Sequence, residues 1–113
     1  MATVYPDYER DGYFLHHAVK LSELYPQSFP IPSAHERYGI QEGSVVKLIF
    51  RFAHPRAPGR DYDTERMWVI ACERSDDHWI GELINEPQHN PGIINAGHLF
   101  HFHPDHIIAI EER

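Results

Sequence analysis

The segment from Ser44 to Phe52 constrains the fold most, because its side chains alternate between apolar and polar types. The apolar positions share one face of an extended chain: Val46, Leu48, Phe50 and Phe52. Lys47 and Arg51 lie on the other face. A period of two residues is typical of a β-strand that covers a hydrophobic core with one face. The segment therefore predicts a half-buried strand in a mainly β fold.

Further short strands are predicted on both sides of this segment. The expected strands cover residues 13–21, 66–73, 79–84, 99–103 and 107–110. Polar loops at 53–65 and 85–97 separate some of them, and a brief turn at 104–106 precedes the last strand. This number of short strands favours a curved sheet over a flat one. We expect a small SH3-like barrel or a strongly bent antiparallel sheet with a short N-terminal helix.

The region before the alternating strand is predicted to be an extension that carries one short helix. Three prolines between Leu24 and Pro32 exclude a helix interior and a central strand. Ser33 and Glu36 have the spacing of a capping box, and Gly39 is placed to end the helix. We expect a single domain over residues 1–113, with the extension at 1–43 and a β-barrel core at 44–113.

The charge balance argues against nucleic acid and membrane partners. Seventeen acidic and ten basic residues give a net charge of −7 with neutral histidines, the wrong sign for binding polyphosphate or an anionic bilayer. The chain shows neither an export signal nor an apolar run of about 20 residues. The lone Cys72 cannot form an internal disulfide and is predicted to be a small buried residue. We expect a cytoplasmic protein.

The second half of the chain contains a pattern shared with a known family. The pattern consists of a Trp-Val strand, a Gly-x-Leu-x-Asn-x-Pro element and a Gly-led strand that ends in isoleucine. It is carried by Arg66-Met-Trp-Val69, Gly81-Glu-Leu-Ile-Asn-Glu-Pro87, Pro91-Gly92 and the segment 97–110. In this half the chain resembles the bacterial family catalogued as domain of unknown function 2314. The resemblance implies a small β domain without an assigned reaction and, for some similar domains, an immunity role beside toxins.

Ten histidines make the chain histidine-rich, and four of them lie between His98 and His106. His101 and His103 are two residues apart on a predicted strand, so they point to the same side, about 6–7 Å apart along the chain. They could form half of a zinc site. The candidates for a third ligand are His16, His17, His89, His98, Asp105 and His106. Alternatively, the intervening Phe side chains face the core, and the two histidines only occupy the wet face of the strand.

The residues predicted to contact a binding partner lie in and beside the two polar loops. They are Tyr62, Trp68, Trp79, Asn85 and Glu86. Asn85 and Glu86 can present polar groups to a pocket beside Trp79, whereas an Asn before a turn can also bind its own backbone.

Catalytic machinery is not visible in the sequence. No two carboxylates have a spacing that supports acid and base roles, and Cys72 lacks a basic neighbourhood that would activate its thiol for a dyad with His78. Gly-rich phosphate loops and paired Cys ligands are absent from the sequence as well. We therefore expect a non-enzymatic binding or regulatory module without a cofactor, with a protein as partner and an immunity-like role as one form of it. The alternative is a metal-binding protein or metal-dependent enzyme that uses zinc at the cluster from His98 to His106.

Overall fold

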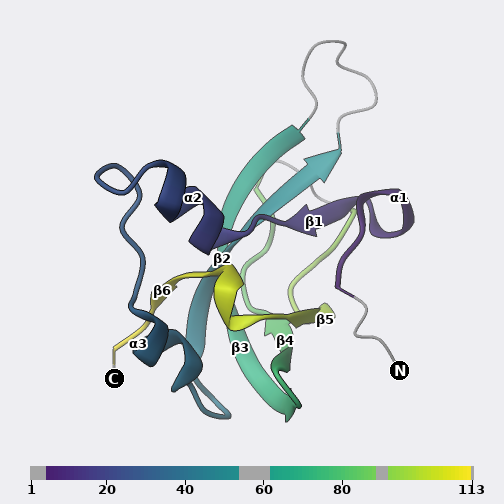
Figure 1. The fold of residues 1–113 in the computed structure, drawn as a ribbon. Coiled ribbons are helices and arrows are strands. Elements are labelled where there is room, and N and C mark those ends of the chain that lie inside the picture. Colours follow the sequence, from purple (N-terminus) through teal and green to yellow (C-terminus); the bar gives the residue numbers. More distant parts are fainter. Residues whose placement is uncertain (1–4, 54–61, 89–91, 113) are drawn as a thin grey trace.

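The computed structural model describes residues 5–53, 62–88 and 92–112. Six antiparallel strands of this part form one curled half-barrel sheet (Figure 1). They are β1 Tyr13–Leu15, β2 Val45–Ala53, β3 Tyr62–Ser75, β4 His78–Leu83, β5 Leu99–Phe102 and β6 Ile107–Ile110. Neighbouring strands follow the order β1-β2-β3-β4-β5, and β6 returns to pair with β2. The predicted mainly β class and strongly bent antiparallel sheet are confirmed.

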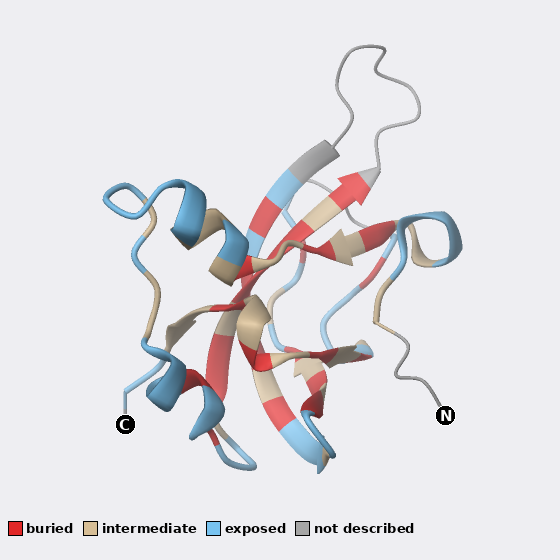
Figure 2. Ribbon diagram, viewed as in Figure 1, coloured by how far each residue is buried: buried red, intermediate tan, exposed pale blue. Residues whose placement is uncertain are grey.

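The core lies on the inner face of this sheet, as the alternation in β2 predicts. The four apolar side chains of β2 at positions 46, 48, 50 and 52 are completely buried. Met67 and Val69 of β3 face the same core, and Leu83, Phe102 and Ile107 close it from the later strands. Figure 2 shows buried and more exposed residues alternating along β3. Burial of this apolar surface is the main driving force for folding.

The predicted strand over residues 13–21 is wrong in its second half. β1 ends at Leu15, and helix α2 covers Ala18–Leu24. His17 starts the helix, because its Nδ1 accepts a hydrogen bond of 3.2 Å from the Lys20 backbone N–H. A side-chain acceptor at this position satisfies a free N–H of the first helical turn. The histidines that interrupt the alternation therefore mark the change from strand to helix.

Three short helices lie in the N-terminal third. Besides α2 they are α1 Tyr8–Asp11 and α3 Ala34–Tyr38. The predicted capping box of α3 is confirmed: Ser33 Oγ accepts from the Glu36 N–H, and Glu36 Oε1 accepts from the Ser33 N–H. The N-terminal residues also contribute β1 to the sheet, where Tyr13 lies opposite Phe52. Among the described residues, no helix is long and apolar enough to span a bilayer.

A β-bulge in the β3–β4 hairpin corrects the prediction for Cys72. The pairing register of the two strands shifts between Ala71 and Glu73, which leaves Cys72 as the extra residue. Its side chain is consequently exposed rather than buried. Desolvation and the nearby Glu82 carboxylate still raise the pKa of the thiol, so Cys72 carries no activated thiolate.

The end of the sheet follows the predicted order. The brief turn before the last strand is the 3-10 helix η1, Pro104–His106. β6 then runs along the first half of β2, with Ile110 opposite Val46.

Candidate functional site

The outer face of β2 and β3 carries the clearest candidate site. Lys47 of β2 lies opposite Trp68 of β3, and Arg66 lies opposite Ile49. Since the core occupies the inner face, alternation places Lys47, Trp68 and Arg66 on the outer one. They border a hollow of about 430 Å³ whose lining also includes Asn85, Glu86 and Gln88. We call this hollow the Trp68 pocket.

Two cations of the Trp68 pocket contact aromatic rings. The Lys47 Nζ lies 4.8 Å from the centroid of the Trp68 ring, and the Arg66 guanidinium carbon lies 5.5 Å from that of Phe29. A cation over the face of a ring is attracted by its quadrupole but keeps its charge. Within the described ranges, no carboxylate forms an ion pair with Lys47 or Arg66. In this part of the chain, both positive charges therefore contact aromatic rings rather than carboxylates.

The opposite wall of the pocket is fixed to β3 by side-chain hydrogen bonds. Asn85 Oδ1 accepts a bond of 2.6 Å from the Trp68 backbone N–H. The buried Glu65 carboxylate accepts one of 2.7 Å from the Gln88 N–H. Glu86 Oε1 accepts another from the Ala96 N–H. The first two bonds hold the segment after β4 against β3, and the third joins two residues of that segment; together they fix the shape of the pocket.

The structure brings together three of the five residues predicted to contact a partner. Trp68, Asn85 and Glu86 line one pocket. The Asn85 amide binds a backbone group of the neighbouring strand, rather than its own backbone. Trp79 lies elsewhere: it is 4% exposed and packs in the core. Tyr62 begins β3, and its side chain lies outside the described part of the structure.

The predicted metal ligands form caps and ring contacts around η1. Phe100 and Phe102 face the core, and His101 and His103 alternate with them, half-buried rather than on a fully wet face. The His101 ring centroid lies 5.1 Å from that of His78. The His103 Nδ1 accepts from the Asp105 N–H at 3.0 Å, and the His106 Nδ1 accepts from the His103 N–H at 2.9 Å. Both histidines thus serve as backbone acceptors.

At two of the predicted ligands, this hydrogen bonding occupies ring atoms that a zinc ion would need. A neutral imidazole that accepts at Nδ1 carries its proton on Nε2, so neither His103 nor His106 has a ring lone pair left for a metal. Within residues 5–53, 62–88 and 92–112, no group of three or more His, Cys, Asp or Glu side chains is placed to hold a metal ion.

Burial holds one of these histidines in its neutral form. The rings of Tyr5 and His17 pack edge-on against His106, with centroids 5.4 and 6.2 Å away. Desolvation, together with the nearby charges of His17 and His103, lowers the pKa of His106 to about 3.

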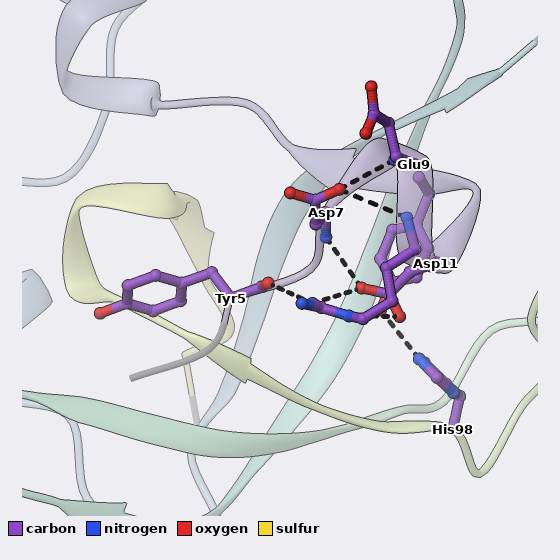
Figure 3. Close-up of polar contacts among 7 residues, drawn as sticks. Tyr5, Asp7, Glu9, Asp11 and His98 are labelled. Atoms are coloured by element: carbon purple, nitrogen blue, oxygen red, sulfur yellow. Dashed lines mark hydrogen bonds and ion pairs between the residues drawn. The ribbon is translucent and has the colours of Figure 1, made fainter. Parts of the chain in front are cut away.

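A second polar cluster lies beside α1 and includes His98, the residue before β5 (Figure 3). Asp7 caps α1 by accepting from the Glu9 and Arg10 N–H groups. The Tyr13 hydroxyl and His98 Nε2 share a hydrogen bond of 2.8 Å. Burial raises the pKa of the Tyr13 phenol and lowers that of His98. The Tyr13–His98 bond therefore ties β1 to the residue before β5.

The chain was also compared with known proteins. No family model matches it, no curated protein is similar to it and no solved structure is similar to it. The resemblance of its second half to the domain of unknown function 2314 therefore stays a prediction.

Proposed function

We propose that this protein is a non-enzymatic binding module that holds a protein partner at the Trp68 pocket. The observation that carries the proposal is the pair of cations, Lys47 and Arg66, which contact aromatic rings and have no carboxylate partner in the described residues. Tryptophan and arginine are the side chains most enriched among the residues that dominate protein interfaces.

Charge supports an acidic group on the partner. The chain as a whole carries −7, yet Lys47 and Arg66 stand together on one side of the pocket, while the carboxylates of Glu65 and Glu86 in its other wall accept backbone hydrogen bonds. Such a site favours an incoming carboxylate through electrostatic complementarity. The specific form of this proposal is a cytoplasmic protein with the immunity-like role that the family resemblance implies.

The test compares affinity capture from the native source by three versions of the full chain. Arg66→Glu reverses one pocket cation. Arg74→Glu is a matched control, because Arg74 is also an exposed β3 residue over an aromatic ring, 6.0 Å from the centroid of Trp79. We expect the wild type and the Arg74 variant to retain the same partner and the Arg66 variant to lose it. Equal capture by all three versions, or none by the wild type, would contradict the proposal.

A further inference from the structure

Three hollows adjoin one another on the outer side of the sheet. Beside the Trp68 pocket lies a second hollow of about 260 Å³, and beyond it lies a third of about 560 Å³. Lys47 and Arg66 border both the first and the second. Pro30, Ile108 and Ala109 border both the second and the third. The second hollow therefore connects the other two, and we call the three together the groove.

The far part of the groove is apolar and runs along a strand edge. Its wall contains Pro30, Ile31, Pro32, Ile40, Ile108 and Ile110. Figure 1 shows the connection between α2 and α3 passing beside β6. Among the described residues β6 pairs with β2 alone, so its other edge carries no strand. An open edge next to apolar pockets is the arrangement in which extended peptides bind to sheets.

Charges of opposite sign lie at two separate positions along the groove. Lys47 and Arg66 stand where the first two hollows meet, and Glu36 and Glu112 border the third. The backbone N–H of Ser33 donates to Glu36 and lowers the pKa of that carboxyl, so it is ionised at neutral pH.

The spacing of these charges sets the length of an occupant. Ala109 lies opposite Lys47, and Glu112 follows three residues later. At ~3.3 Å per residue of extended chain, Glu112 lies at most about 10 Å beyond Ala109. An extended chain covers this distance in three to four residues.

We infer that the groove binds an extended segment of the partner protein, with an acidic side chain against Lys47 and Arg66. Apolar side chains of the segment lie along β6, and a basic side chain lies against Glu36 and Glu112. The inference rests on the proposed function and adds to it the chemistry of the partner.

The test uses three end-capped synthetic peptides and the full-length, isotope-labelled protein in NMR titrations. The peptides are Ser-Glu-Val-Thr-Val-Lys-Ser, Ser-Lys-Val-Thr-Val-Glu-Ser and Ser-Gln-Val-Thr-Val-Gln-Ser, so that both chain directions and an uncharged reference are covered. We expect at least one charged peptide to bind about fivefold more tightly than the uncharged one, the size expected of exposed ion pairs. The chemical-shift changes that this peptide causes in the protein should fall on residues 30–32 and 108–110.

Variants assign this binding to the groove. The double variant Lys47→Glu with Arg66→Glu should lose the advantage of the charged peptide, and Arg74→Glu should keep it. Ile108→Thr should weaken binding of every peptide, while Leu99→Thr, a matched change at an exposed strand position, should not.

Two results would overturn the inference. One is that all three peptides bind with equal affinity, that they shift only residues outside 30–32 and 108–110, or that none of them binds. The other is a dimer of the free protein, seen by sedimentation, that Ile108→Thr dissociates, because the occupant would then be a second copy of this chain. If peptides fail while Arg66→Glu still loses the captured partner, only this inference falls. If Arg66→Glu retains the partner, the proposed function falls instead.

Discussion

Replacing Asn85 by alanine tests how the Trp68 pocket is built. In an antiparallel strand the N–H and C=O groups of one residue point to the same side. The Trp68 C=O accepts from the Ile84 N–H, and its N–H donates to Asn85 Oδ1 at 2.6 Å. The last recorded pair of the β3–β4 ladder is Val69 with Leu83. The Asn85 side chain thus supplies the acceptor that an additional residue of β4 would provide.

The expected loss of stability follows from this single bond. Asn85→Ala leaves the partly buried Trp68 N–H without an acceptor, which costs about 2 kcal/mol. For a chain of 113 residues this corresponds to a fall of roughly 8 °C in the thermal midpoint, at ~4 °C per kcal/mol. In urea the unfolding midpoint should fall by about 1 M.

The free energy of unfolding is measured in urea, with tryptophan fluorescence as the signal. Two control variants make the result specific. Asn85→Asp keeps the oxygen acceptor and should stay within ~0.5 kcal/mol of the wild type, because a charged acceptor forms an equal or stronger bond. Asn95→Ala makes the same change at an exposed position. The reasoning is refuted if Asn85→Ala matches Asn95→Ala, or if Asn85→Asp is as damaging as Asn85→Ala.

Three further predictions concern the core and the histidines. Gly81→Ala should destabilise by about 1–3 kcal/mol in urea unfolding, because a Cβ there would lie 2.6 Å from Val69 Cγ1 and 2.8 Å from Phe102 Cε1. A smaller loss in a Val69→Ala background would assign part of the clash to Val69, and a Gly81→Ala protein as stable as the wild type would contradict the prediction. The pKa of His106 is about 3 in the fold and ~6.5 when unfolded, so the unfolded state takes up the proton first as pH falls. The free energy of unfolding should therefore fall from about pH 6.5 downward, with a slope approaching ~1.4 kcal/mol per pH unit. His106→Asn, which keeps an acceptor, should flatten that slope between pH 7 and 5, where most carboxylates stay ionised; an unchanged slope would show that other groups cause it. Adding zinc should leave the thermal midpoint unchanged, whereas a rise that disappears on His101→Gln with His103→Gln would restore the metal alternative.

Local patterns predicted most of the fold. Alternation located β2, and the capping box at Ser33 located α3, because both signals depend only on neighbouring residues. The change from strand to helix at His17 was not predicted, since histidine is an unusual helix cap. The exposure of Cys72 was missed for a different reason: a bulge is a property of strand pairing, and the sequence of one strand does not specify it.

The candidate site was predicted only in part, because strand pairing rather than local sequence brings some of its residues together. Trp68 and Asn85 were identified as candidates because they lie beside polar loops. Lys47 and Arg66 were missed, because only the pairing register of β2 and β3 places Lys47 opposite Trp68. Trp79 was misplaced although a local signal existed: Trp79, Gly81 and Leu83 alternate, and all three are buried.

Site-specific photo-crosslinking in the native source tests most directly whether a protein docks at the Trp68 pocket. A photoreactive phenylalanine derivative would replace Thr64, an exposed residue that lines the pocket, and in a second version Glu73, an exposed β3 residue beyond the bulge. We predict a discrete crosslinked adduct from position 64 and none from position 73. Equal adducts at both positions, an adduct only at 73, or none at 64 would contradict the assignment of the binding site.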